Sequence, residues 1–427
     1  MDPMLTVAQA EALILQRVPR PNADQDREFV DLMAACDRIL AQPLTTTVDF
    51  PHWDNSAMDG YAVRFADVQV CHPDRPVALQ VIAEIPAGAA PQCTVNPGQA
   101  ARILTGSMMP TGADTVVMQE NTRRDGELVF ILTPPSGSGA FVRRQGAFYQ
   151  AGTPLLPAGI RLQAPELAVL AAAQLTPVPV YRRPNVAILS TGSELIPPDR
   201  PLQPGQIVDS NQYALTALVA QAGANPLPLG IIPDDPTILE QTIHQAVATA
   251  DLVISSGGVS VGDYDYVEAI LAKLGAEIAV RSVAMRPGKP LTVATLKSPT
   301  RSTPVLYFGL PGNPVSALVT FWRFVQPALL KRAGLARSWG PVFTQALTTQ
   351  ELRGDSKRET YLWGQIHATE QGYRFHPVEG GHNSGNLINL AQTNALAVLA
   401  TGQQVHPANS PVQVMVVGQP LTGGNYL

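Results

Sequence analysis

The clearest pattern in the chain is the alternation of short apolar runs and amphipathic segments between residues 182 and 333. The apolar runs predict buried strands, and each of them leads into a loop that contains glycine. We expect strands at Val186–Ser190, Leu252–Ser255 and Val305–Phe308, and helices at Gln212–Ala222, Pro236–Ala250, Val267–Leu274 and Pro314–Arg332. Strands that alternate with helices predict a three-layer α/β domain with a parallel sheet and right-handed crossovers.

Helical patterns lie on both sides of a β-rich stretch in the first half of the chain. Thr6 and Gln9 have the spacing of a capping box, so an amphipathic helix is expected to begin there. A second helix is expected over Glu28–Leu40. Ala164–Ala173 is apolar and rich in alanine, which favours a further helix that packs back on the first two. Residues 5–46 and 146–181 are therefore predicted to form one elongated helical domain.

Two other stretches have the short, turn-bounded apolar runs that are typical of strands. Residues 47–145 are predicted to form a β-rich second domain, with strands at Val77–Ile82, Thr115–Met118 and Leu128–Leu132. Residues 334–427 are predicted to form a small C-terminal β-barrel, with strands at Val342–Leu347, Tyr361–His367, Ala395–Leu399 and Val412–Val417. The expected fold class is thus multidomain α/β.

Composition narrows the range of functions. The chain has 427 residues and a net charge of −5, which argues against non-specific binding of nucleic acid. No apolar run approaches the roughly 20 residues of a membrane span, and the N-terminal stretch lacks the basic start of a signal peptide. Cys36, Cys71 and Cys93 do not have metal-ligand spacing, and the seven histidines show no HxxH pairing. We therefore expect a cytoplasmic protein without zinc.

The loop after the Leu252–Ser255 strand is the most informative stretch. Small residues follow one another at Ser256, Gly257, Gly258 and Ser260, so successive backbone N–H groups can point into one concavity and bind an oxyanion. Asp263 and Asp265 follow at once, and carboxylates beside an anion site suggest a divalent cation. A tight connection with surface aspartates is the simpler alternative.

Three more loops of the α/β domain have a related character. They are Thr191-Gly192-Ser193-Glu194, the turn from Arg286 to Pro290 with Lys289, and Pro311-Gly312-Asn313-Pro314 at the start of a helix. Arg286 and Lys289 suit the oxygens of phosphate or molybdate. Glu194, Asp234 and Asp265 would repel such an anion unless Mg²⁺ lay between them. In a parallel α/β sheet these loops meet at the carboxyl ends of the strands, where ligands bind.

Six runs of the sequence closely resemble the molybdopterin molybdenumtransferase family, which is similar to the E domain of gephyrin. They are DNSAMDGYA (54–62), TGSMMPTGADTVVMQE (105–120), STGSEL (190–195), SSGGVSVGDYDY (255–266), MRPGKP (285–290) and LPGNPVSA (310–317). The resemblance runs from about residue 5 to about 418. It implies that adenylylated molybdopterin is bound, that its phosphoanhydride is split with release of AMP, and that molybdate is delivered to the dithiolene. It also implies a homodimer whose active site lies between the α/β domain of one chain and the second domain of the other.

Matching the motifs residue by residue assigns expected roles. The acidic functional residues of the family match Asp59, Glu194, Asp234 and Asp265, and its basic pair matches Arg286 and Lys289. The prolines beside its oxyanion match Pro311 and Pro314, and its C-terminal residues thought to contact molybdate match Arg358 and Ser384. Judged on the residues alone, Asp59 also suits a turn before Gly60, and Arg358 and Ser384 suit ordinary exposed positions.

The chain departs from the family at one motif. Where the family usually has Gly-Glu-Asp, this sequence has Gly146-Ala147-Phe148, so both carboxylates are absent. Two other functions therefore stay open: an adenylyltransferase of the preceding step, whose fold is similar to residues 182–333, and a non-catalytic scaffold. An upstream adenylyltransferase and downstream molybdoenzymes are possible protein partners.

Overall fold

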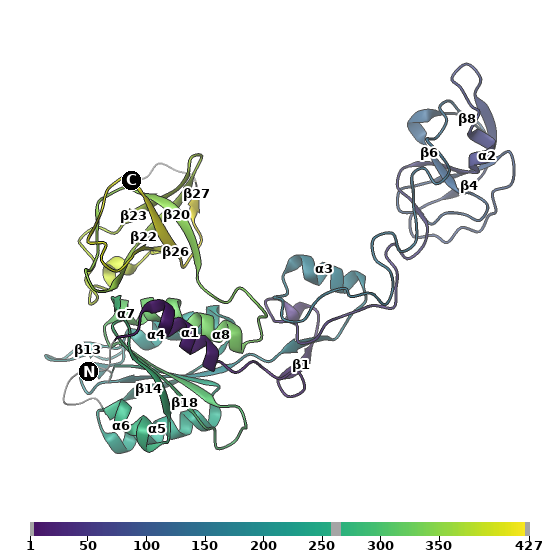
Figure 1. Cartoon of the computed structure of the whole chain (residues 1–427). Helices are drawn as coiled ribbons and strands as arrows, with labels where there is room; N and C mark the ends of the chain where they lie inside the picture. Colours follow the sequence, from purple (N-terminus) through teal and green to yellow (C-terminus); the bar gives the residue numbers. More distant parts are fainter. Residues whose placement is uncertain (1–3, 258–265, 423–427) are drawn as a thin grey trace. The chain divides into compact units, whose positions relative to one another are not determined.

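The computed structural model describes residues 4–257 and 266–422, which form two compact units (Figure 1). One unit contains the described residues up to Gln42, Ala158–Leu167, and those from Thr176 onward. The other contains Pro43–Pro157 and Ala168–Leu175. The four-domain division of the chain stays a prediction.

A six-stranded sheet forms the centre of the first unit. Its strand order is β14 (Asn225–Ile232), β11 (Asn185–Thr191), β15 (Leu252–Ser256), β19 (Val305–Leu310), β18 (Pro290–Leu296) and β16 (Glu277–Ser282). The three predicted strands are confirmed as β11, β15 and β19, which run parallel to one another. The expectation of a fully parallel sheet is wrong, because β18 is antiparallel to both of its neighbours. The connections on either side of β18 are too short to hold a helical crossover.

Helices cover both faces of this sheet (Figure 1). The helices α5 (Pro236–Thr249) and α6 (Tyr266–Lys273) pack on one face, while α4 (Asn211–Gln221), α7 (Pro314–Thr320), α8 (Gln326–Arg332) and α1 (Val7–Arg17) pack on the other. The capping box of Thr6 and Gln9 is present at the start of α1. Val7, Ala10 and Ile14 of α1 are buried in the core of the α/β sheet, so this helix packs there rather than on residues 146–181.

The segment predicted as one long helix over Pro314–Arg332 contains a π-helical turn, η3 (Phe321–Val325), between α7 and α8. Arg323 of this turn is buried and donates to Glu11 of α1 through Nη1 and Nη2, at 2.6 and 2.9 Å. Its Nε donates to the hydroxyl of Tyr361, at 3.1 Å, in the C-terminal region. One guanidinium therefore joins three segments that are far apart in the sequence.

The C-terminal region is a small closed β-barrel, as predicted. Its strands pair in the ring β22 (Glu359–Thr369), β23 (Gly372–Pro377), β20 (Val342–Thr348), β26 (Pro411–Val416) and β24 (Ala395–Leu399), and β24 pairs back with β22. Two short strands add to it, β17 (Met285–Arg286) and β27 (Leu421–Thr422), both beside β22. Because β17 belongs to the turn that carries Arg286, the barrel and the basic turn share backbone hydrogen bonds.

The helix expected over Glu28–Leu40 is wrong. The chain forms strand β1 (Arg27–Val30), which pairs with β10 (Val178–Tyr181), and then the short 3-10 helix η1 (Met33–Ala35). A distant strand partner has overridden the local helical pattern. The helix expected at Ala164–Ala173 is confirmed as α3 (Ala164–Ala172), and it is the one helix among the described residues of 146–181.

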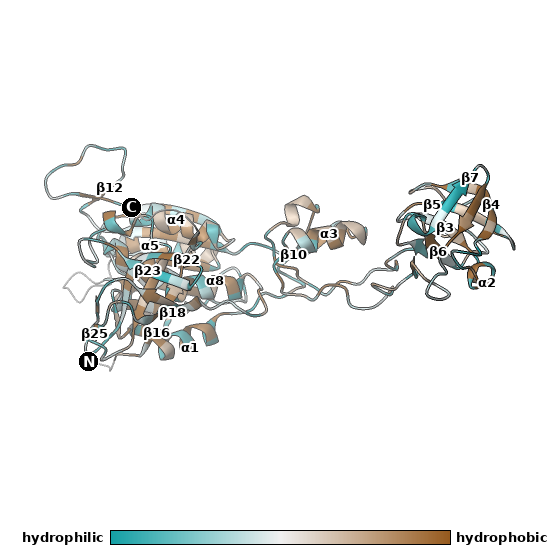
Figure 2. Ribbon diagram, turned by 90° about the horizontal axis from the view of Figure 1, so that it is seen from above, coloured by the Kyte–Doolittle hydropathy of each residue, from teal (hydrophilic) through white to brown (hydrophobic). Residues whose placement is uncertain are grey.

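The second unit contains another six-stranded sheet. Its order is β6 (Thr115–Met118), β3 (Gly60–Val63), β5 (Gln99–Ile103), β4 (Val77–Ile85), β8 (Leu128–Ile131) and β7 (Thr122–Asp125), so the three predicted strands are confirmed. The edge strand β7 is hydrophilic (Figure 2), as suits an exposed strand. Gly60 opens β3 where a Cβ atom would lie 2.0 Å from the carbonyl oxygen of Val117, so the close pairing of β3 and β6 requires glycine.

A buried carboxylate anchors the start of β15. Asp251 accepts hydrogen bonds from Arg182 (2.8 Å to each oxygen), Arg301 (2.8 Å), Arg332 (2.9 Å) and the amide of Asn185 (2.8 Å). Burial alone would raise the pKa of Asp251, but the hydrogen bonds from Arg182 and the charge of Arg332 outweigh it and hold the pKa well below its usual 3.8. The ionised form of Asp251 is therefore stabilised by folding.

We predict that Asp251→Asn lowers the free energy of unfolding by about 3–5 kcal/mol, because it leaves buried guanidinium groups without a counter-charge. Since the pKa of Asp251 is lower in the folded chain, its contribution is complete above about pH 4 and is lost as the pH falls further. Urea unfolding at several pH values measures both effects. The exposed Asp24→Asn is the matched control, and equal stabilities of the two variants would contradict the prediction.

Candidate functional site

A cavity of about 930 Å³ lies at the carboxyl ends of the parallel strands. Most of the residues expected there line it together: Thr191, Gly192, Glu194, Asp234, Ser256, Gly257, Pro311, Gly312, Asn313 and Pro314. Gly257 has φ +90°, and a Cβ atom on it would lie 2.4 Å from the carbonyl oxygen of Thr191. This close approach of two loops requires glycine. Gly258, Ser260 and Asp265 lie outside the described residues.

Two carboxylates belong to this first cavity. Asp234 accepts a hydrogen bond from the amide of Ser193 (3.0 Å), and the amide of Asp234 donates to the Ser193 hydroxyl (3.2 Å). The carboxylate of Glu194 folds back over Gly192, where a Cβ atom would lie 2.7 Å from it. In the part of the chain that the structure describes, no three acidic, histidine or cysteine side chains are grouped as metal ligands.

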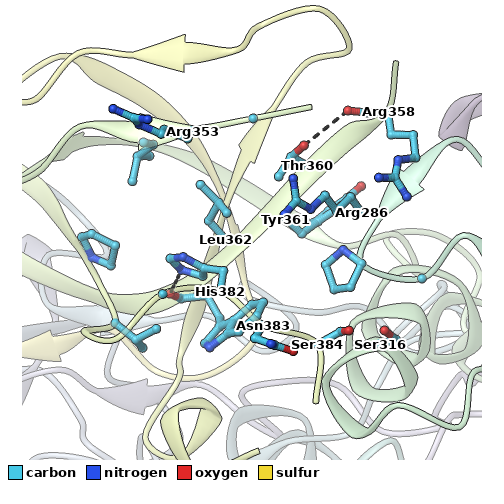
Figure 3. A pocket seen from close by; sticks show the side chains of 18 of the residues that line it. Arg286, Ser316, Arg353, Arg358, Thr360, Tyr361, Leu362, His382, Asn383 and Ser384 are labelled. Carbon is cyan, nitrogen blue, oxygen red and sulfur yellow. Dashed lines mark hydrogen bonds between the residues drawn. The ribbon is translucent and has the colours of Figure 1, made fainter. Parts of the chain in front are cut away.

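A second cavity, of about 1350 Å³, has a basic character (Figure 3). Arg286 and Lys289 line it from the turn between β16 and β18, Ser316 from helix α7, and Arg358 and Ser384 from the barrel. Residues far apart in the sequence meet here because Arg286 pairs with Thr360 in the β17–β22 ladder. The structure thus brings the basic pair, Arg358 and Ser384 to one cavity, while their roles stay predictions.

Arg358 is held in place by a neighbouring carboxylate. Its Nε and Nη2 donate to one oxygen of Asp355, at 3.2 and 2.7 Å. The hydrogen bond from Arg358 lowers the pKa of Asp355, so this carboxyl stays ionised. Arg286 and Lys289 are exposed and form no ion pair within residues 4–257 and 266–422. Their charges are thus available to an anionic ligand.

The two cavities adjoin each other. Pro290 and Asn313 line both of them. One amide at the start of helix α7 is used by the protein itself. The amide of Val315 donates to the carbonyl oxygen of Ser384 (3.3 Å). This hydrogen bond joins the start of α7 to the barrel segment that carries Ser384.

Several residues that line the cavities were not foreseen from the sequence, and three of them have notable contacts. Ser190 and Asn211 line the first cavity, and His382 lines the second. The Nε2 atom of His382 (Figure 3) lies 2.9 Å from the carbonyl oxygen of Trp363. The imidazole ring of His382 also packs against the indole of Trp363 in an edge arrangement. Burial lowers the pKa of His382, which favours the neutral ring. The one signal that the sequence offered for these residues was the position of Asn211, a polar residue at the start of a helix beside the first cavity.

Asp59 belongs to the second unit and is exposed there. Its Oδ1 accepts from the hydroxyl and the amide of Thr105, both at 2.7 Å, and these hydrogen bonds lower its pKa. In the same unit Phe148 is 73% exposed on a turn whose amides at Gly146 and Phe148 donate to the carbonyl oxygens of Pro51 and Phe50. The position where the family has an acid thus presents an apolar ring to solvent.

Comparisons with known proteins agree along the length of the chain. Residues 5–173 match the MoeA N-terminal region (domain I and II), residues 187–331 a probable molybdopterin binding domain, and residues 345–417 the MoeA C-terminal region (domain IV). A molybdopterin molybdenumtransferase of Nostoc sp. is 60% identical over 413 residues, which cover 97% of this chain and 94% of the relative. The chain belongs to the molybdopterin molybdenumtransferase family.

More distant family members agree in sequence and in fold. The molybdopterin molybdenumtransferase of Haemophilus influenzae is 36% identical, over 86% of this chain and 88% of its own length. The crystal structure of a molybdopterin biosynthesis MoeA protein from Pyrococcus horikosii superposes with a TM-score of 0.80 at 29% identity, and covers 98% of this chain and 100% of that one. In this chain, none of the helices among residues 4–257 and 266–422 is both long and apolar enough to cross a membrane.

We predict that Lys289→Ala weakens molybdate binding about tenfold. The substitution removes the exposed ammonium, and with it one charge-assisted contact to molybdate that water partly screens. The free energy of unfolding should change by no more than about 0.5 kcal/mol, since Lys289 is exposed. Titration calorimetry with molybdate and thermal unfolding measure the two quantities.

Lys297→Ala is the matched control, because Lys297 is also exposed but does not line the cavity. Unchanged affinity together with a large fall in melting temperature would make Lys289 a structural residue and would place the anion elsewhere.

Proposed function

We propose that this family member releases AMP from adenylylated molybdopterin and inserts molybdate into the dithiolene, which forms the molybdenum cofactor. The observation that supports this most directly is the pair of adjoining cavities with opposite character. One is bordered by the carboxylates Glu194 and Asp234, and the other by the cations Arg286, Lys289 and Arg358. A reaction that splits a phosphoanhydride and then uses a second oxyanion needs both.

In this proposal the first cavity holds the phosphoanhydride. Thr191, Ser256 and Gly257 end two parallel strands, and their small side chains let backbone groups approach phosphate oxygens closely. Glu194 and Asp234 fit Mg²⁺, because this ion commonly uses one or two carboxylates together with substrate phosphates and water. Asp265 joins them by resemblance. Mg²⁺ bound there would neutralise the charge that develops as water attacks the anhydride, its P–O bond breaks and AMP leaves.

The second cavity holds molybdate as the second substrate. Arg286, Lys289 and Arg358 attract the dianion, and the hydroxyl of Ser384 can donate to one of its oxygens. Insertion replaces one molybdate oxygen by the two dithiolene sulfurs, and that oxygen leaves as water with the two thiol protons. Because Pro290 and Asn313 border both cavities, the dithiolene of molybdopterin has a short path to molybdate once AMP has left.

The two other functions are less well supported. An adenylyltransferase needs no basic wall from a barrel, whereas Arg358 and Ser384 supply one here. A scaffold needs no carboxylates at a phosphate cavity, whereas Glu194 and Asp234 border it. Ala147 and Phe148 favour a scaffold, because both carboxylates of that family motif are absent, yet the acidic residues Asp59, Glu194 and Asp234 are present.

We predict that the purified chain releases AMP from adenylylated molybdopterin, that molybdate accelerates the release, and that chelation of Mg²⁺ stops it. Glu194→Gln and Asp234→Asn should each lower kcat by about 10²-fold or more and change KM little, because the charge they oppose develops in the transition state. Single-turnover measurement of AMP gives these values.

Asp199→Asn is the control, because Asp199 is exposed and lies outside the lining of the first cavity. AMP release that continues at full rate in excess chelator would refute the role of Mg²⁺. The absence of any AMP release would refute the function.

We further propose a cytoplasmic homodimer in which Asp59 of one chain serves the first cavity of the other. Its support is the resemblance, together with the place of Asp59 in a different compact unit from Glu194. We predict that a mixture of Asp59→Ala and Glu194→Ala chains recovers part of the activity that each variant lacks. Light scattering that shows a fully active monomer at micromolar concentration would contradict the shared site.

A further inference from the structure

The side chain of Asn211 holds two loops of the first cavity together. Asn211 is buried at the start of α4 and lines the cavity. Its Nδ2 donates to the hydroxyl of Ser256 (2.6 Å) and to the carbonyl oxygen of Gly312 (2.8 Å). The Ser256 hydroxyl donates in turn to the carbonyl oxygen of Pro311 (3.4 Å). The ends of β15 and β19 are therefore linked through one amide.

These contacts fix the orientation of the amide. The carbonyl oxygen of Gly312 can only accept a hydrogen bond, so the group that faces it must be the NH₂ of Asn211. The Oδ1 atom of Asn211 is left as an acceptor, and it is buried without a hydrogen-bond partner among residues 4–257 and 266–422. A carbonyl oxygen in this state costs folding free energy of the order of a lost hydrogen bond.

A second oxygen in the same state lies on the same face of the sheet. Ser190 is 1% exposed, lines the same cavity, and its Oγ is also buried without a partner in the described part of the chain. Ser190 of β11 is in register with Ser256 of β15, and residues in register on parallel strands point to the same face. Ser190 and Asn211 therefore both adjoin the Ser256 hydroxyl.

We infer that Ser190 and Asn211 position the organic part of the substrate, by hydrogen bonds to a neutral group that carries at least one O–H or N–H donor. The Oδ1 of Asn211 can only accept, while the Ser190 hydroxyl can both donate and accept. The pair does not suit a phosphate or molybdate oxygen, which has no proton for Asn211. The ribose hydroxyls, the amino group of adenine and the ring N–H groups of a pterin all have this chemistry.

This inference rests on the proposed function, because it takes adenylylated molybdopterin as the ligand of the first cavity. It adds that Ser190 and Asn211 recognise a neutral part of the ligand by hydrogen bonds. The charged groups of the cavity, Glu194 and Asp234, act on a different part of the ligand. It also explains a cost in the fold. An alanine at position 190 would leave no hydroxyl to satisfy, so the serine there costs stability.

The test compares Ser190→Ala and Asn211→Ala with Thr216→Val, by calorimetry with AMP and with 6-hydroxymethylpterin. Thr216 is the matched control, because its hydroxyl on α4 is also buried without a described partner but does not line the cavity. We expect Ser190→Ala to bind one of the two probes about three- to tenfold more weakly, which is the effect of one neutral hydrogen bond. Its melting temperature should be unchanged or higher, and Thr216→Val should bind as the wild type does.

The probe that loses affinity identifies the half of the substrate that meets the pair. If it is AMP, 2′-deoxy-AMP and 3′-deoxy-AMP distinguish the ribose from the base, since the analogue without the bonded hydroxyl binds wild type and Ser190→Ala equally. Asn211→Ala should lose affinity for the same probe, with a lower melting temperature because its loop contacts are also lost. Wild-type binding that Ser190→Ala leaves unchanged, or a fall in its melting temperature, would overturn this inference alone. A wild-type chain that binds neither probe would contradict the proposed function as well.

Discussion

The contact of Arg323 with Glu11 and Tyr361 is the constraint on which the candidate site depends. Burial opposes the charge of Arg323, but the carboxylate of Glu11 more than offsets this and raises the pKa of the guanidinium. Burial raises the pKa of Tyr361, so its hydroxyl stays protonated. This hydroxyl donates a hydrogen bond to Glu359. The π-helical turn gives Arg323 this position between helix α1, the α/β core and strand β22 of the barrel. Together with the β17–β22 pairing, this contact holds the barrel beside the basic turn, where the second cavity lies.

The division of charge between the cavities follows from this packing. The α/β sheet supplies small residues and two carboxylates at the ends of its parallel strands, as folds of this kind commonly do around phosphate. The barrel supplies Arg358 and Ser384 to the opposite side of a cavity that already holds Arg286 and Lys289. A dianion can thus be bound at the cations, while the carboxylates of the other cavity would need a divalent cation to accept a second anion.

The sequence predicted the elements whose pattern is local and missed those that depend on distant partners. Buried parallel strands such as Val305–Leu310 are continuous apolar runs, and Asp235 with Pro236 is a clear helix start, so both could be read directly. Residues 28–40 have a helical pattern, but Arg27–Val30 pairs with a strand about 150 residues away, which no local signal reveals. The meeting of Arg358 with Arg286 was expected from resemblance alone, because its cause is the β17–β22 pairing. The unpartnered oxygens of Ser190 and Asn211 could not be predicted, since they emerge only when every hydrogen bond around them is known.

The central claim of this account is that the barrel and the α/β domain of one chain together form the molybdate site. Anomalous X-ray diffraction from crystals soaked in tungstate, a heavier oxyanion of the same shape and charge, tests it directly. The account predicts an anomalous peak within hydrogen-bond reach of Arg286 or Lys289 on one side and of Arg358 or Ser384 on the other. A peak confined to the first cavity, among Thr191, Gly257 and Gly312, would contradict it.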